Sequence, residues 1–287
     1  METTTPCWPK EKPTNIIVRM PNWLGDLVMA TPVLADLRRY YPEAKITAMC
    51  QSNVSPLLAH DPNIDHLFSY SRPKGWRPSE IITFLKKGPY DLGILLTNSL
   101  SSAWWFWRGN VKNRIGFAGN LRNWLLNKAV PFPPERETRH LVLTYKHLLD
   151  PLGISVSDTS TKLYTTDEEI QKARELLSQH GIEYGKHTLF GMNPGAAYGS
   201  AKCWLPERFV DVTRRLLQNP DAYVLYFGDN AGAPVVKEIC EKLPERVINL
   251  AGKTNLRELM ALIKSCSAFL TNDSGPMHIA AALDTPL

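Results

Sequence analysis

Two patterns of hydrophobic and polar residues take turns along the chain. Short apolar runs such as Ile16-Ile17-Val18 predict buried strands. The segments between them have apolar residues every three or four positions, which predicts amphipathic helices. In the first half, the pattern predicts strands at 15–20, 45–49, 91–97 and 114–117, an extended segment at 64–70, and helices at 27–40, 54–59, from 79, 101–108 and 137–149.

The alternation resumes after residues 151–166, which are rich in Ser, Thr and Gly and have no strong period. Thr166 and Glu169 form a capping-box signature at the start of the next helix, and Asn255 is in position to cap a later one. The second half is predicted to hold helices at 167–180, 206–217, 233–243, 255–265 and from 279, and strands at 188–192, 223–227, 247–250 and 268–270.

Strands that alternate with helices over short turns predict parallel sheets covered by helices. We therefore expect an α/β protein with two doubly wound, Rossmann-like domains that face each other across a cleft. The expected divisions are a tail at 1–14, a first domain at 15–155, a linker at 156–166 and a second domain at 167–287. Because Leu287 follows a turn where another strand is expected, we also expect the second domain to be C-terminally truncated.

Composition narrows the class of protein. An apolar content of 44% and a charged content of 21% are typical of a soluble globular chain. Residues 1–14 lack the apolar core of a signal peptide, and the charge-free run 92–107 is shorter and more polar than a membrane span of ~20 residues. Five widely spaced cysteines without a CxxC pair argue against a zinc site or a disulfide framework and favour a reducing cytosol.

Charge is distributed unevenly between the two halves. Residues 1–150 hold 19 Lys and Arg against 12 Asp and Glu, a balance of +7, and residues 151–287 hold 14 against 16, a balance of −2. This asymmetry favours an anionic partner for the first half, although a need for solubility would explain the same charge. Basic runs never exceed two residues, which argues against a nucleic-acid-binding tail.

The segment 271–278, Thr-Asn-Asp-Ser-Gly-Pro-Met-His, carries the strongest functional signal. It joins an apolar strand to a small-residue helix, and such a turn presents backbone N–H groups and the positive end of the helix dipole to an anion. Pro276 suits the first helical position. Asp273 would repel a phosphate, so a carboxylate beside this turn suggests a ligand with both phosphate and hydroxyl groups. Alternatively, Asp273 or Ser274 is an ordinary helix cap.

Two further loops follow predicted strands. In the loop 21–26, Asp26 is either a general base for an acceptor hydroxyl or the N-cap of the next helix. In the loop after 188–192, small residues leave the backbone open to a ligand. There Lys202 is either a cation for a departing diphosphate or an ordinary surface lysine. The sequence leaves open whether His278 contacts a ligand or makes a structural hydrogen bond.

Two other segments have competing interpretations. The run 104–107, Trp-Trp-Phe-Trp, favours core packing over contact with an acceptor or a membrane interface. Asp229 and Asn230 follow a predicted strand, where they would be near a nucleoside or simply form a turn.

Three motifs together resemble one known family. Residues 21–26 (Pro-Asn-Trp-Leu-Gly-Asp), residues 193–196 (Asn-Pro-Gly-Ala) with Lys202 and Trp204, and residues 272–278 are similar to the ADP-heptose:lipopolysaccharide heptosyltransferases of glycosyltransferase family 9. The resemblance is greatest to the heptosyltransferase II subfamily, which Asn98-Ser99 and residues 114–117 also resemble. It runs in order from about residue 15 to residue 287.

The resemblance implies a GT-B fold and an inverting transfer of heptose from ADP-heptose to the first heptose on Kdo-lipid A, without a metal or a further cofactor. By this analogy Asp26 is the general base, Lys202 stabilises the diphosphate, and Asp273 binds heptose hydroxyls. The implied acceptor-binding residues are Asn22, Trp23 and Gly25. The implied donor-binding residues are Gly195, Ala196, Ala197, Lys202, Asp273, Ser274, Gly275, Met277 and His278.

The resemblance also implies a cytoplasmic enzyme at the inner face of the inner membrane, with no nucleic-acid partner. The sequence departs from the family pattern at Ala197 and Tyr198, where relatives carry hydroxyl or acidic side chains, and after Asp229, where relatives often continue with an acidic run. The competing hypotheses are another GT-B enzyme, either a different nucleotide-sugar transferase or an epimerase, and a non-catalytic lipopolysaccharide-binding remnant.

Overall fold

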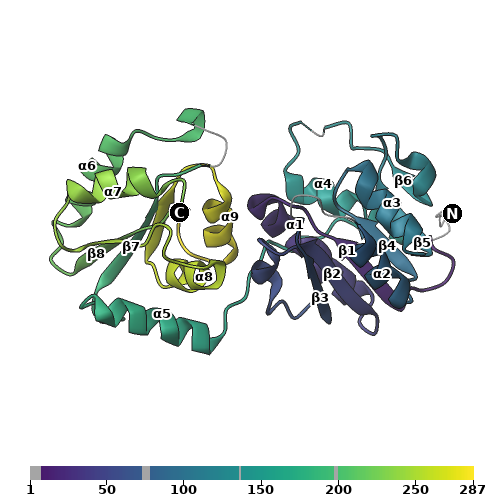
Figure 1. The fold of residues 1–287 in the computed structure, drawn as a ribbon, viewed down its shortest axis with the longest axis horizontal. Helices are drawn as coiled ribbons and strands as arrows, with labels where there is room; N and C mark the ends of the chain where they lie inside the picture. The colour runs from purple at the N-terminus through teal and green to yellow at the C-terminus, as the bar shows by residue number, and fades with distance from the viewer. Residues whose placement is uncertain (1–7, 73–77, 136, 197–199) are drawn as a thin grey trace. The chain divides into compact units, whose positions relative to one another are not determined.

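The computed structural model describes residues 8–72, 78–135, 137–196 and 200–287. The chain forms two compact units, Met1–Lys162 and Leu163–Leu287, and the division between them falls inside the stretch 156–166. In each unit, helices cover both faces of a parallel sheet (Figure 1). The expected doubly wound α/β class is therefore confirmed.

In the part of the first unit that the structure describes, a six-stranded sheet has the order β3-β2-β1-β4-β5-β6, and every pairing is parallel. The strand order runs outward in opposite directions from β1 and β4. The carboxyl ends of these two strands therefore form a topological switch point, where doubly wound sheets bind ligands. The strands are β1 (Asn15–Arg19), β2 (Lys45–Gln51), β3 (His66–Tyr70), β4 (Leu92–Leu95), β5 (Asn113–Phe117) and β6 (Lys128–Val130).

The helices of the first unit pack in pairs. Helix α1 (Leu24–Tyr40) contacts α4 (Leu141–His147), and α2 (Ser79–Lys87) contacts α3 (Leu100–Arg108). The α2–α3 pair closes a core with Ile17, Met49 and Leu95 of the sheet. Three short 3₁₀ turns complete the described part of this unit, at η1 (Ser55–Leu58), η2 (Asn123–Leu125) and η3 (Asp150–Leu152).

The second unit holds a four-stranded parallel sheet over its described residues, in the order β10-β7-β8-β9. The chain moves outward from β7 to β9 and then returns to β10, so the switch point lies at the carboxyl ends of β7 and β10. These strands are β7 (Thr188–Asn193), β8 (Ala222–Tyr226), β9 (Val247–Asn249) and β10 (Ala268–Thr271).

Helices α6 (Pro206–Leu216) and α7 (Ala233–Glu241) pack together over one face of this sheet. The other helices form a second packed group, in which α8 (Leu256–Lys264) contacts both α5 (Asp167–Gln179) and α9 (Gly275–Ala282). Capping boxes at Thr166 with Glu169 and at Asn255 with Glu258 start α5 and α8, which confirms both sequence signatures. The remaining 3₁₀ turn is η4 (Ser200–Lys202).

Several predicted boundaries were wrong. Helix α1 begins three residues earlier than predicted, with Trp23 at its N-cap, so Asp26 lies in the first turn and the N-cap interpretation of Asp26 is wrong. Strand β6 was missed because its three residues form no recognisable run. The segment 54–59 contains only the 3₁₀ turn η1, and the segment predicted as a helix from 137 forms α4 only from Leu141. None of the described helices is both long and apolar enough to cross a membrane.

Candidate active site

Two buried asparagines connect the loops at the switch point of the second unit. Asn193, the last residue of β7, donates from Nδ2 to Gly195 O at 3.1 Å and to the hydroxyls of Thr271 and Ser274, each at 3.2 Å. Asn272, just after β10, donates to Pro194 O at 2.7 Å and accepts from the backbone N–H of Trp204 at 3.0 Å. These bonds hold three chain segments together around the start of α9.

The amino end of α9 is arranged to receive an anion. Its N-cap is Ser274, whose side chain does not cap the first turn and instead contacts Asn193 and Thr271. The helix begins at Gly275, so Pro276 occupies the second helical position instead of the predicted first. At Gly195, the space that a Cβ would occupy has no heavy atom of the described residues within 4 Å. Backbone N–H groups at a helix start with such open space suit a phosphate group.

Lys202 and Asp273 form an ion pair beside this helix start. Lys202 Nζ lies 2.6 Å from Asp273 Oδ2, and both side chains are substantially exposed. The hydrogen bond from Lys202 and its charge hold the pKa of Asp273 below its usual value, and the charge of His278 acts in the same direction. A cation is thus held next to the positive end of α9, and Asp273 is already engaged with it.

The remaining predicted donor residues lie around the same point. Ala196 is partly exposed next to Gly195, and Met277 and His278 lie partly buried in the first turn of α9. Trp204 is exposed, with its ring edge-on to Phe209 at 5.5 Å between centroids. Ala197 and Tyr198 lie outside the described residues.

The loop after β1 brings the predicted acceptor residues together at the switch point of the first unit. Asn22 and Trp23 are exposed, and Gly25 and Asp26 are partly buried in the first turn of α1. The pairing of α1 with α4 places Tyr145 close to Asp26. Burial raises the pKa of the Tyr145 hydroxyl, and the negative charge of Asp26 raises it further.

Arg19, the last residue of β1, holds this loop from beneath. The side chain is only 1% exposed, and its guanidinium donates to the Met20 carbonyl, to the Tyr70 hydroxyl, and to Asn22 Oδ1 at 2.5 Å. Gln51 Nε2 donates to the same Asn22 oxygen at 3.0 Å. The oxygen of the Asn22 amide therefore faces these two donors, and its NH₂ group lies on the opposite side of the amide.

A second buried arginine, Arg122, holds the loop after β4. Its guanidinium donates to Phe117 O at 2.8 Å, to the Thr97 carbonyl, and to Asn98 Oδ1 at 3.2 Å. Burial lowers the pKa of Arg122 to about 10, so the side chain stays positive at neutral pH. Each of the two loops at the first switch point, after β1 and after β4, is thus held by its own buried arginine.

The sequence of residues 80–287 matches the family model for glycosyltransferase family 9 (heptosyltransferase). The chain belongs to glycosyltransferase family 9. It is 33% identical to lipooligosaccharide heptosyltransferase 2 of Haemophilus influenzae, in an alignment that covers 95% of this chain and 82% of the relative.

Solved structures of related proteins agree with this membership. A family 9 glycosyl transferase from Veillonella parvula superposes with a TM-score of 0.87 at 26% identity, over 95% of this chain and 78% of that one. ADP-heptose lps heptosyltransferase II of E. coli superposes with a TM-score of 0.84 at 27% identity, over 95% and 83%. The expected GT-B class and glycosyltransferase activity are therefore confirmed.

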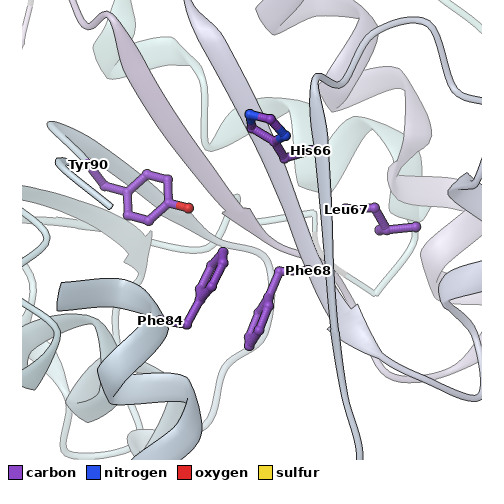
Figure 2. Close-up of a pocket in the computed structure, with 5 residues that line it drawn as sticks. All are labelled: His66, Leu67, Phe68, Phe84 and Tyr90. Atoms are coloured by element: carbon purple, nitrogen blue, oxygen red, sulfur yellow. The ribbon is translucent and has the colours of Figure 1, made fainter. Parts of the chain in front are cut away.

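An aromatic pocket of the first unit lies away from its switch point. This cavity of about 390 Å³ is lined by His66, Leu67, Phe68, Phe84 and Tyr90 (Figure 2). Figure 2 shows the rings of Phe68 and Phe84 face to face, and their centroids are 3.6 Å apart. His66 opens β3 and Tyr90 precedes β4, so the pocket is near the amino ends of the strands, whereas family 9 chemistry is expected at the carboxyl ends.

Sequence reasoning missed Arg19 and Arg122 as residues that shape the candidate site, and it included Asn193 in a motif without giving its side chain a role. A signal was present for Arg19 and Asn193, since an Arg or Asn that ends an apolar strand is often buried with its polar atoms paired. Asp229 accepts from the backbone N–H of Gly232 at 2.8 Å, which supports the turn interpretation of that residue. The described residues contain no group of three or more His, Cys, Asp and Glu placed to hold a metal ion, and the metal-independent mechanism stays a prediction.

Proposed function

We propose that this glycosyltransferase transfers L-glycero-D-manno-heptose from ADP-heptose to the inner-core heptose of lipopolysaccharide, with inversion at the anomeric carbon. The observation that carries the proposal is the Lys202 cation beside the open start of α9 at the second switch point. The names of the Haemophilus relative and of the E. coli structure support the choice of donor and acceptor.

In the proposed donor site, the ADP diphosphate lies against the first turn of α9 and against Gly195 and Ala196. Backbone N–H groups and the helix dipole stabilise its negative charge, and Lys202 stabilises the additional charge that develops as the sugar bond breaks. Asp273 holds Lys202 before the donor binds, and its carboxylate then accepts hydrogen bonds from heptose hydroxyls. Metal ions and further cofactors have no role in this proposal.

In the proposed acceptor site, Asn22, Trp23 and Gly25 bind the acceptor sugar and Asp26 acts as the general base. The Asp26 carboxylate takes the proton of the acceptor hydroxyl, whose oxygen forms a bond to the anomeric carbon of the donor heptose. The bond between that carbon and the phosphate oxygen breaks, and ADP leaves with the electron pair. Attack from the face opposite the leaving group inverts the anomeric centre.

We further propose that the acceptor is heptosyl-Kdo-lipid A and that the enzyme works at the cytoplasmic face of the inner membrane. The phosphates and carboxylates of such an acceptor complement the +7 balance of residues 1–150. Nucleic acid is not a partner in this proposal.

Replacement of Asp26 tests the proposed chemistry. Asp26→Asn keeps the shape of the side chain but removes the base, so we expect kcat to fall by about 10²–10⁴ while ADP affinity stays nearly unchanged. The matched control is Asp158→Asn, because Asp158 is an exposed aspartate of the same unit. Heptose transfer at the native rate by Asp26→Asn would remove Asp26 from the role of base.

A further inference from the structure

An exposed apolar surface in the first unit has no part in the chemistry proposed above. It consists of Leu100 and Trp107 on α3 and of Leu121 and Trp124 in the loop between β5 and β6, and we call it the tryptophan patch. Leu121 is 86% exposed and Trp124 is 70% exposed. Apolar side chains gathered on one surface are typical of an interaction site, whereas single exposed apolar residues are common on any protein.

Contacts within the patch join Trp107, Trp124 and Leu121. The rings of Trp107 and Trp124 lie edge to face, with centroids 6.2 Å apart. Leu100 and Trp107 are seven residues apart on α3 and so share a face of the helix. Trp124 Nε1 donates to Leu121 O at 3.0 Å, so the polar atom of the ring is paired inside the loop.

The loop that carries Leu121 is held in an unfavourable conformation. Gly119, Asn120 and Leu121 have φ values of 115°, 51° and 55°, and this region strongly disfavours a leucine. The conformation is maintained by a bond of 2.8 Å from Gly119 N to Asn123 Oδ1 and another of 2.8 Å from Asn120 Nδ2 to Asn98 O. A strained residue that is held in place and points outward indicates a function for its side chain.

The chain segment that carries the patch has only basic charged residues. Residues 92–134 contain no Asp or Glu and five basic residues, Arg108, Lys112, Arg114, Arg122 and Lys128. The Arg108 guanidinium lies over the Trp107 ring at 5.9 Å. Arg122 and Arg114 are engaged with carbonyl groups of the protein, and Lys112 and Lys128 are exposed.

We propose that the tryptophan patch docks the enzyme on an anionic lipid bilayer, with Leu121 and Trp124 entering the headgroup region. Tryptophan and leucine favour the membrane interface when lysine and arginine flank them, because the rings bury apolar area and the cations attract anionic lipids. The inference rests on the proposed function in one respect, that the acceptor is carried by a membrane lipid. It adds the surface of this chain that meets that membrane.

Co-sedimentation with vesicles tests the docking directly. The native chain is mixed with vesicles of equal parts phosphatidylglycerol and phosphatidylcholine, or with phosphatidylcholine alone. We expect Leu121→Asn with Trp124→Ser to lower the partition into anionic vesicles by about tenfold or more. Lys112→Gln and Lys128→Gln each lower it by about fivefold, with a smaller effect on neutral vesicles.

Two controls separate docking from folding. Asn tolerates a positive φ better than Leu, so Leu121→Asn leaves the midpoint of thermal unfolding unchanged or higher if Leu121 serves docking. A lower midpoint together with native vesicle partition would assign Leu121 to the fold and overturn the proposal. Tyr184→Ser removes an aromatic ring of the second unit that is 49% exposed and packs under Arg174 at 4.2 Å. We expect native partition for that variant.

An activity measurement separates this inference from the proposed function. The patch variant is expected to transfer heptose at the native rate to a soluble, deacylated acceptor and more slowly to the same acceptor in vesicles. Equal loss on both acceptors would overturn the docking role. Failure of the native chain on both acceptors would refute the proposed function while the sedimentation result still stands. An alternative is that the native chain self-associates through the patch. If the patch variant loses self-association but keeps native vesicle partition, the patch is an interface between two copies of the chain, and the proposal is overturned.

Discussion

At the residue scale, the site depends on polar side chains whose partners lie far away in the sequence. Lys202 and Asp273 are 71 residues apart and meet at 2.6 Å. Asn193 and Ser274 are 81 residues apart and meet at 3.2 Å. Each motif was visible in the sequence as a separate loop, but the pairing of Asp273 with Lys202 was not.

Lys202→Met tests the cation of the proposed donor site. Because Lys202 would stabilise charge that develops on the leaving diphosphate, we expect kcat/KM for heptose transfer to fall by about 10²–10³. Lys186→Met, which removes a lysine of an exposed ion pair in the same unit, is expected to retain native kcat/KM. An unchanged kcat/KM in Lys202→Met would contradict the role assigned to this residue.

The same variant is expected to change the pKa of Asp273. Its pKa is lowered chiefly by the hydrogen bond and the charge of Lys202, so in Lys202→Met the pKa rises toward the usual value for an aspartate. In the native protein the ion pair makes its full contribution to folding stability at pH values above the usual pKa of an aspartate. That contribution is lost as the pH falls through the lowered pKa of Asp273. Titration of the Asp273 carboxyl carbon by NMR measures both values, and identical curves would show that the ion pair does not form in solution.

At the element scale, a buried ion pair attaches the connecting segment to the first unit. Lys146 Nζ on α4 lies 3.7 Å from Asp36 Oδ2 on α1, and both side chains are almost fully buried. Ser157 Oγ donates to Asp36 at 2.7 Å, and Lys146 Nζ donates to Thr159 O at 2.7 Å. The pair thereby holds α1, α4 and residues 157–159 together.

Removal of one partner leaves a buried charge without compensation. Lys146→Met is therefore expected to lower the free energy of unfolding of the first unit by about 3–5 kcal/mol. Asp36→Asn combined with Lys146→Met removes both charges and recovers part of that loss. Urea unfolding followed by circular dichroism measures the differences, with Lys172→Met on the exposed face of α5 as a neutral control. If the double variant is less stable than Lys146→Met, the charge left on Asp36 is not the cause of the stability lost in Lys146→Met.

At the scale of the whole molecule, the two sheets have separate switch points, and we assign the donor to the second unit. ADP at a hundredfold excess over its Kd is then expected to stabilise the second unit by about 2.7 kcal/mol. Differential scanning calorimetry of the full chain with ADP, UDP and GDP checks this, because ADP alone is expected to raise the midpoint of thermal unfolding. Stabilisation by UDP-sugars and not by ADP would instead favour another GT-B enzyme.

Much of the fold could be predicted because it depends on local patterns. Short apolar runs such as Ile16-Ile17-Val18 alternate with amphipathic helices along the chain. This alternation determines the strands, the helices and the parallel pairing. Boundaries were predicted less well. Leu24 joins α1 although Asp26 looks like an N-cap, and β6 forms from three residues whose strand conformation depends on pairing with β5.

The α/β class, the capping boxes and the three motifs that identify the family could all be predicted, because each depends on neighbouring residues. Which groups meet in space depends on the packing of the folded chain. In the folded chain, the buried Arg19 donates to Asn22, and Lys202 pairs with Asp273. Within the run 104–107, Trp105 and Phe106 are buried and Trp107 is exposed. Trp124 lies beside Trp107. Such contacts join positions far apart in the chain, and long-range packing fixes them where local pattern has no information.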